Sequence, residues 1–165
     1  MPLHIESTSS PRSEELVRIF LRHHHSGVLA TSSSAGNPHA AVIYYVLDDD
    51  LSILFGTKSE TQKYKNMEEN KRVALAVYDE SMQSIIQVMG GVEFVDDKRL
   101  REKVLSHMGK VSMEVSAENI PPAAKLEAGD YMIVRIIPNV IKLAEYGFAK
   151  PGSDDLFETV VFGSD

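Results

Sequence analysis

The fold is decided by residues 32–57, SSSAGNPHAAVIYYVLDDDLSILFGT. Tyrosines and β-branched residues in this stretch favour β-strands, and two groups of turn-forming residues interrupt them. The first group is Gly36, Asn37 and Pro38, and the second is the acidic run at residues 48–50. The pattern predicts strand, turn, strand, acidic turn and strand, which is an antiparallel meander.

A helix from about Arg12 to His24 is predicted before this meander. Pro11 suits the first turn of a helix, and Glu14 and Glu15 place negative charge near the positive end of the helix dipole. The small apolar run GVLAT, residues 27–31, then begins the first strand.

The segments after the meander predict further strands separated by two helices. A short helix is expected from Ser59 to Glu69 and a second one over residues 96–108. Strands are expected at RVALAVYD (72–79), SIIQVMGGVEFVDD (84–97) and YMIVRIIPNVIKLAEY (131–146). The Gly90–Gly91 pair suits a β-bulge, which helps a sheet curl. LFETVVF (156–162) is either an edge strand or an arm laid on another subunit, so the chain is mainly β and predicts a small barrel.

Length and composition indicate one globular domain over residues 1–165. Hydrophobic residues make up 43% of the chain and charged residues 25%. Residues 1–11 are expected to form a flexible N-terminus and residues 147–165 a C-terminal arm. The net charge of −7, with basic residues scattered among acids, argues against nucleic acid as a partner. The polar N-terminus and the lack of a long apolar run predict a cytoplasmic protein without a membrane segment.

Metal and thiol chemistry have few candidates. The chain has no cysteine, which excludes disulfides and thiolate ligands. His23, His24 and His25 are consecutive, so on a helix they point about 100° apart and cannot converge on one ion. The run Asp48–Asp49–Asp50 lacks the spaced oxygen ligands of a calcium loop and is interpreted as a turn. No metal site is predicted.

The stretch most informative about chemistry is FGTKSETQKYKN, residues 55–66. It leaves a strand at Gly56 and enters a helix at Ser59, and Ser59 to Gln62 fits the S-x-x-Q capping box. The positive end of the helix and its free N–H groups would suit a phosphate monoester. Further donors there are Thr57, Lys58, Thr61 and Lys63. The alternative is an ordinary capped surface helix.

Four segments in order resemble the pyridoxamine 5'-phosphate oxidase-related, FMN-binding split-barrel family. They are GVLAT, GNPHAAVIYYV, LSILFGTKSETQKYKNMEENKRVALAVYD and IIQVMGGVEFVDD. The resemblance covers Arg12 to Tyr146. It implies a six-stranded antiparallel split β-barrel that forms a homodimer, with FMN in the clefts between the subunits.

The resemblance also assigns cofactor-binding positions. The strand segment Ala41, Val42, Ile43 and Tyr44 resembles the strand that lies along the flavin and gives it backbone hydrogen bonds. Thr57, Thr61, Gln62 and Lys63 match the end of the next strand and the positions that hold the FMN phosphate. Gln87 matches a glutamine that contacts the polar edge of the flavin. The alternatives are a plain core strand and a solvent-facing glutamine.

Three departures from the family pattern argue against the vitamin B6 oxidase itself. Gln62 and Ala41 stand where arginines are expected, and the C-terminal substrate-binding arginine motif is missing. Phosphate affinity would therefore depend on Lys63, Lys58 and the helix end, and FMN binding is expected to be weaker than in arginine-bearing relatives.

The leading hypothesis is an FMN-dependent oxidoreductase with a small-molecule substrate or electron donor. The flavin would carry the redox chemistry, and no side chain is nominated as a catalytic residue. One alternative is a flavin-binding carrier, sensor or protective protein without turnover. Another is a related split barrel that holds haem or a deazaflavin, although the sequence supplies no clear axial histidine.

Overall fold

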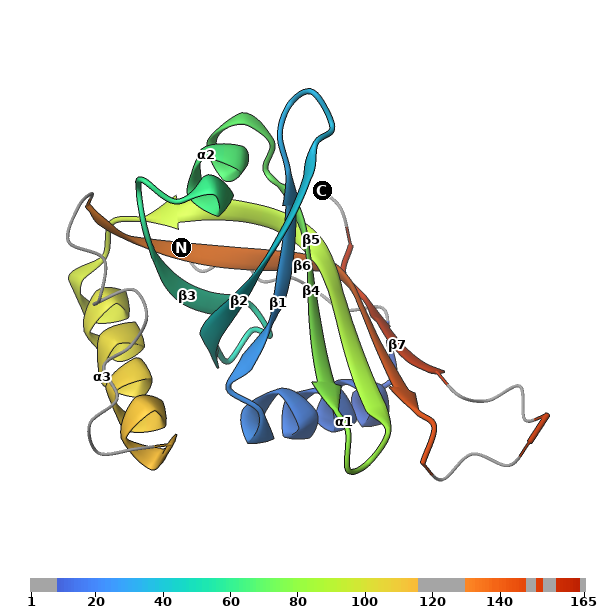
Figure 1. The fold of residues 1–165 in the computed structure, drawn as a ribbon. Helices are drawn as coiled ribbons and strands as arrows, with labels where there is room; N and C mark the ends of the chain where they lie inside the picture. The colour runs from blue at the N-terminus through green and yellow to red at the C-terminus, as the bar shows by residue number, and fades with distance from the viewer. Residues whose placement is uncertain (1–8, 116–129, 148–150, 153–156, 164–165) are drawn as a thin grey trace.

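The structure is a computed structural model, and it describes residues 9–115, 130–147, 151–152 and 157–163. Figure 1 shows the helices around a curved sheet. The helices are α1 (Pro11–His23), α2 (Gln62–Glu69) and α3 (Lys98–Val115). The strands are β1 (Ser26–Ser32), β2 (Pro38–Leu47), β3 (Ile53–Lys58), β4 (Arg72–Asp79), β5 (Ser84–Val95), β6 (Tyr131–Glu145) and β7 (Phe157–Val161). The predicted helices and strands are therefore present, and α3 runs on past Met108 to Val115.

Six of the strands close into an antiparallel barrel. Their order is β3-β2-β1-β4-β5-β6, and β3 pairs with β6 to complete the ring. Strand β7 pairs with β6 on the same edge as β3 but further along the strand, at residues 140–144, so it is an edge strand on the same chain. The six-stranded antiparallel barrel predicted from the sequence is confirmed.

The main hydrophobic core fills the barrel, and α1 and α2 close its ends. Val17 and Leu21 of α1 and Met67 of α2 are buried in the same cluster as the inward-facing strand residues. The Tyr45 hydroxyl donates a hydrogen bond to the Leu21 carbonyl at 3.1 Å, which satisfies a helix-end carbonyl inside the core.

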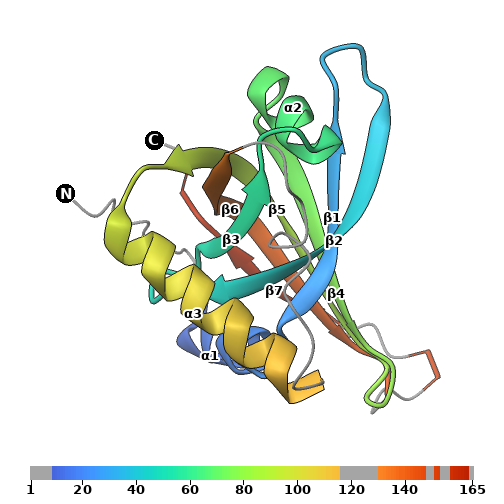
Figure 2. The ribbon, with the colours of Figure 1, turned by 60° about the vertical axis from the view of Figure 1, so that its left-hand side comes forward.

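Strand β3 is buried on both of its faces. Phe55 points into the barrel, whereas its neighbour Leu54 packs outside it with Val104 and Met108 of α3. Figure 2 shows α3 on the same side of the barrel as β3. A strand covered on both faces accounts for the uninterrupted apolar run of β3, where a half-exposed strand would alternate.

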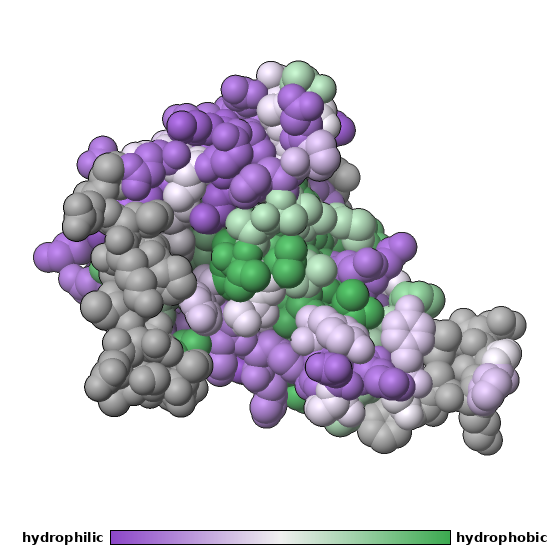
Figure 3. All heavy atoms as spheres, in the orientation of Figure 1, coloured by the Kyte–Doolittle hydropathy of each residue, from purple (hydrophilic) through white to green (hydrophobic). Residues whose placement is uncertain are grey.

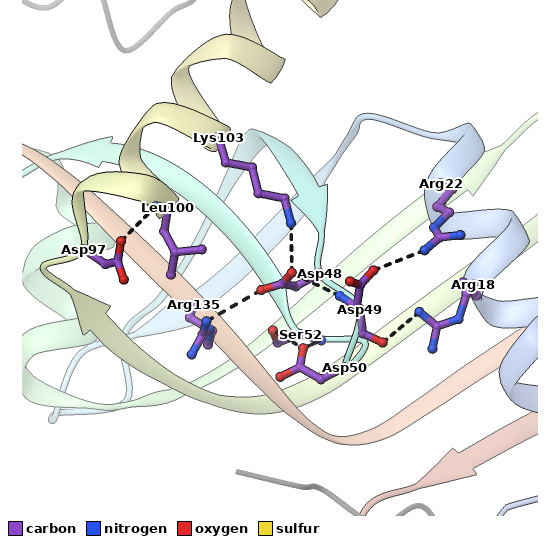
Figure 4. A network of polar contacts seen from close by, with 10 residues as sticks. All are labelled: Arg18, Arg22, Asp48, Asp49, Asp50, Ser52, Asp97, Leu100, Lys103 and Arg135. Atoms are coloured by element: carbon purple, nitrogen blue, oxygen red, sulfur yellow. Dashed lines mark hydrogen bonds and ion pairs between the residues drawn. The ribbon is translucent and has the colours of Figure 1, made fainter. Parts of the chain in front are cut away.

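The acidic turn after β2 connects α1 and α3 to the barrel, as Figure 4 shows. The Asp48 carboxylate accepts a hydrogen bond from Lys103 of α3 at 2.8 Å and lies 3.6 Å from the Arg135 guanidinium of β6. Asp49 accepts a hydrogen bond from Arg18 of α1 at its carbonyl, at 2.9 Å. The run is a turn, as predicted, and its carboxylates are used in ion pairs.

The predicted bulge lies between Met89 and Gly90, where the pairing of β5 with β6 shifts register. A Cβ on Gly90 would come within 2.1 Å of the Ile137 carbonyl oxygen, which is backbone and cannot move aside. A Cβ on Gly91 would meet nothing closer than 3.9 Å, an ordinary contact. The two adjacent glycines therefore have different roles.

We expect Gly90→Ala to lower the free energy of unfolding by about 1–3 kcal/mol, because the methyl group forces β5 and β6 apart. Gly91→Ala is the matched control and should change it by less than about 0.5 kcal/mol. Urea denaturation of both variants measures the difference. Equal effects would contradict the close approach of the strands at Gly90.

We also expect a pH-dependent effect of Asp48→Asn. Partial burial would raise the pKa of Asp48, but the hydrogen bond from Lys103 and the nearby Arg135 outweigh it and lower that pKa. The stabilisation is thus present above the unfolded-state pKa of about 3.9 and is lost as the pH falls through the lowered folded value. The variant should lose about 1 kcal/mol at neutral pH, and this difference should shrink below about pH 4. Asp49→Asn, at a fully exposed carboxylate, should show neither effect.

Candidate functional site

The barrel is split between β2 and β3. Strand β2 pairs with β1 from Pro38 to Tyr44, but with β3 only from Tyr45 to Leu47. No described strand pairs with the other edge of residues 38–44. The Tyr45 N–H donates to the His25 carbonyl, so the main-chain groups of Tyr45 face the β1 side. Successive residues of a strand turn their N–H and C=O groups toward opposite edges of the strand. The N–H and C=O groups of Val42 and Tyr44 therefore face the free edge.

The predicted flavin strand offers its backbone more than its side chains. Ile43 is buried in the core, and Ala41 alternates onto the same inner face. Val42 lies outside and is 67% exposed, while Tyr44 packs against the cluster beneath α3. One face of this segment packs in the core, and one edge of its backbone is paired with no described strand. It is therefore not a plain core strand.

The capping box predicted at Ser59 is wrong, because the N-cap of α2 lies two residues later. This N-cap is Thr61, whose hydroxyl accepts a hydrogen bond from the Tyr64 N–H. Ser59 is engaged instead with Asp130 at the start of β6. Its N–H donates to the Asp130 carbonyl and its hydroxyl accepts from the Asp130 N–H, both at 2.9 Å. These bonds attach the turn between β3 and α2 to the adjacent strand.

The threonine hydroxyls of this turn lie together. Thr57 and Thr61 are in hydrogen-bond contact at 3.0 Å, and Thr61 also donates to the Lys58 carbonyl at 2.8 Å. Thr57 is buried and faces the barrel interior. Strand alternation places the Lys58 side chain on the opposite face of β3, so Lys58 does not join the two threonines.

Gln62, at the position where arginine is expected, belongs to an internal polar chain. Its amide donates to the Asn66 side chain at 2.8 Å, and Asn66 donates to the Thr31 hydroxyl at 3.0 Å. Asn66 and Thr31 are both buried, so this chain anchors α2 to β1. This internal polar chain was not predicted from the sequence, although polar residues spaced i, i+4 at Gln62 and Asn66 were a signal.

Lys63 is the cation of the predicted phosphate site. It is half-buried, and burial lowers its pKa. No carboxylate lies within ion-pair distance of it among the described residues. The first turn of a helix also leaves the N–H groups of Gln62 and Lys63 without an intrahelical acceptor. The turn therefore offers one partly desolvated ammonium and free amide donors.

Gln87 lies elsewhere, on the exposed outer face of β5. Toward β2, the row of cross-strand neighbours runs from Gln87 to Ala76, Val28 and Val42. On its other side, Gln87 is paired with Lys142 of β6. Three strand spacings of about 4.8 Å separate Gln87 from Val42. The predicted cofactor residues thus divide between the turn before α2 and the outer face of the sheet.

His24 and His25 are engaged with their surroundings. The ring of His24 bonds to the Phe20 carbonyl at 2.7 Å and to Asp79 at 3.0 Å, and His25 contacts the ring of His107. In the described part of the chain, no three metal-ligating side chains form a group that could hold an ion. The same residues include no helix long and apolar enough to cross a membrane.

Solved structures of low sequence identity share this fold. A pyridoxamine 5'-phosphate oxidase-related, FMN-binding protein from Nostoc punctiforme is 12% identical, with a TM-score of 0.60 over 95% of this chain and 100% of that one. An FAD-binding protein from Mesorhizobium loti is 18% identical, with a TM-score of 0.60 over 84% and 94%. A heme-binding protein from Mycobacterium smegmatis is 14% identical, with a TM-score of 0.63 over 93% and 60%. At these identities the likeness is evidence for the fold alone.

Sequence comparison is more specific. No curated protein shows significant sequence similarity to the chain. The family model described as pyridoxamine 5'-phosphate oxidase, however, matches residues 13–143, from α1 through most of β6. This span includes the free edge of β2, the turn before α2 and Gln87. The chain therefore belongs to the pyridoxamine 5'-phosphate oxidase family, as the order of its motifs predicted.

Proposed function

We propose that the chain binds FMN at the split between β2 and β3 and acts as an FMN-dependent oxidoreductase. The observation that carries the proposal is Lys63, a half-buried lysine without a carboxylate partner among the described residues, in the first turn of α2. A partly desolvated ammonium is costly unless an anion compensates it. The FMN phosphate would supply that anion.

The surrounding donors suit a phosphate better than a carboxylate. The N–H groups at the start of α2 and the Lys63 ammonium approach from different directions, and a phosphate presents three oxygens to receive them. The Thr61 hydroxyl would join by turning away from the Lys58 carbonyl, to which it now donates at 2.8 Å. Because Gln62 is bound to Asn66, Lys63 would be the main source of positive charge.

The free edge of β2 suits the polar edge of the flavin ring. Val42 and Tyr44 present alternating N–H and C=O groups there, and the pyrimidine edge of a flavin alternates acceptors with a donor. Main-chain pairing of this kind holds a planar ligand as an added strand would be held. The bound flavin would supply the electron transfer, and the chain would bind, orient and shield it. A carrier or sensor that holds flavin without turnover uses the same contacts.

We propose further that the protein is a homodimer formed through the outer face of the sheet. Two cross-strand rows on this face are almost free of charge: Val42, Val28, Ala76, Gln87, Lys142, Thr159 and Ala40, Ala30, Ala74, Met89, Val140, Val161. Figure 3 shows the hydrophobic side chains gathered in the middle of this face, with hydrophilic ones around them. Such a surface fits a second copy of itself across a two-fold axis. Gln87 would then reach a flavin bound at the subunit boundary.

FMN binding by the Lys63→Ala variant tests the phosphate site. We expect the affinity to fall at least tenfold with the fold unchanged, because a charge-assisted hydrogen bond contributes about 1.5–3 kcal/mol. Lys65→Ala, two residues along the same helix and exposed, is the matched control and should bind FMN normally. Quenching of flavin fluorescence on titration gives both affinities, and equal affinities would place the phosphate elsewhere.

The absorption spectrum of the purified protein distinguishes the cofactors. Flavin bands support the proposal, and reduction by NADH or NADPH followed by reoxidation separates an oxidoreductase from a carrier. A Soret band, or failure to bind added FMN, would contradict the proposal that the protein binds FMN.

We expect Val28→Lys to convert the dimer to a monomer, because the lysine would be buried against the apolar sheet face of the second copy. Val28 is 44% exposed in the single chain. Ile19→Lys is the control, since Ile19 is 47% exposed on α1, away from the sheet face. Sedimentation equilibrium measures the mass of each variant. A monomeric parent protein would rule the dimer out.

A further inference from the structure

A pocket separate from the proposed flavin contacts lies where β5, α3 and β6 meet. Its volume is about 380 Å³, within the range of about 300–1,000 Å³ that small-molecule sites occupy. It is lined by Phe94, Val95, Asp96, Arg101, Asp130, Tyr131 and Met132. None of these residues is assigned to FMN.

The apolar walls of the pocket are held in place by contacts outside it. The Phe94 ring packs against Tyr64 at 4.9 Å between centroids, and the Lys71 ammonium lies 4.1 Å from its centre. The Tyr131 ring occupies the space that a Cβ on Gly56 would fill. Rings fixed in this way present a preformed surface, which lowers the entropic cost of binding a ligand.

Hydrogen bonds of the side chain or of the main chain hold Tyr131, Asp130 and Arg101 in place at the wall of the pocket. The Tyr131 hydroxyl donates to the Met108 sulfur at 3.1 Å. The Asp130 main chain is held by its two hydrogen bonds to Ser59, and the Arg101 N–H donates to the Asp97 carbonyl. The Asp130 carboxylate and the Arg101 guanidinium take no part in these bonds, and both residues line the pocket.

The charged groups of the pocket are of both signs and are not paired with one another. Asp96, Arg101 and Asp130 form no ion pair within the described part of the chain. A guanidinium binds a carboxylate through two parallel hydrogen bonds, and carboxylates bind an ammonium group. A ligand that carries both groups would satisfy all three side chains, whereas a simple anion would face two carboxylates.

We infer that this pocket binds a small zwitterion with an apolar body, of the class of an aromatic α-amino acid. Arg101 receives the carboxylate, Asp96 and Asp130 receive the ammonium group, and Phe94 and Met132 contact the apolar body. Since Asp130 is bonded to Ser59 in the turn before α2, the occupied pocket adjoins the segment that carries Thr61 and Lys63. The ligand is recognised independently of the flavin.

Isothermal titration of the full-length protein with four probes tests this assignment. We expect L-phenylalanine to bind saturably and to bind at least tenfold more tightly than each truncated analogue. The analogues are 3-phenylpropionate, which lacks the ammonium group, phenethylamine, which lacks the carboxylate, and glycine, which lacks the apolar body. An analogue that binds as tightly as L-phenylalanine would overturn the zwitterion assignment, and so would the absence of saturable binding at millimolar L-phenylalanine.

Variants then assign each charge. Arg101→Gln should weaken L-phenylalanine at least tenfold and leave phenethylamine unchanged. The double variant Asp96→Asn/Asp130→Asn should weaken phenethylamine and should not weaken 3-phenylpropionate, which no longer faces two carboxylates. Arg99→Gln is the control, because Arg99 is exposed in the same helical turn and does not line the pocket. If Arg99→Gln and Arg101→Gln have equal effects, the pocket is not the binding site. FMN affinity measured on the same samples reports folding and keeps this result separate from the flavin proposal.

Discussion

The departure of β3 from β2 after three paired residues is the constraint on which the rest of the structure depends. Strand β3 pairs with β2 only at residues 53–55, but with β6 along its whole length. The N–H and C=O groups of β3 that face β6 are paired along the whole strand, whereas those on the opposite edge are paired only where β2 lies beside residues 53–55. The same departure closes the barrel and leaves one edge of β2 without a strand.

The helices follow from this arrangement. A barrel of six strands has two open ends, and α1 and α2 cover them with Val17, Leu21 and Met67. Closing the ring also exposes the outer, apolar side of β3, where Leu54 would face water. Helix α3 covers that side and is attached by the ion pair between Lys103 and Asp48. The polar turn after β2 therefore adds an ion pair to the apolar contacts by which Val104 and Met108 hold this helix on the barrel.

The strand order along the chain could be predicted because each strand has a local signal. Alternating or continuous apolar runs, turn residues and the glycine pair at Gly90–Gly91 gave the elements and the bulge. The split followed only from the resemblance to the family and not from any local signal, since it depends on which strand pairs with β3, a contact between residues far apart in the sequence. The start of α2 was misplaced for the same reason. Ser59 has the right local pattern for a cap, but its bonds to Asp130, 71 positions along the chain, take that serine away from the helix.

In the candidate site too, some features could be predicted from the sequence and others are properties of the folded chain. Its charged member, Lys63, could be named from the sequence, but its lack of a carboxylate partner is a property of the folded chain. Gln62 was named for the position where an arginine is expected, and the structure uses it instead to anchor Asn66 and Thr31. Such a site depends on one lysine and on main-chain groups at a helix start and a strand edge. Main-chain groups do not change when side chains do, so a site of this kind would tolerate wide changes of sequence. In the proposed site, the single cation at Lys63 would make phosphate binding more dependent on one side chain than it would be beside an additional arginine.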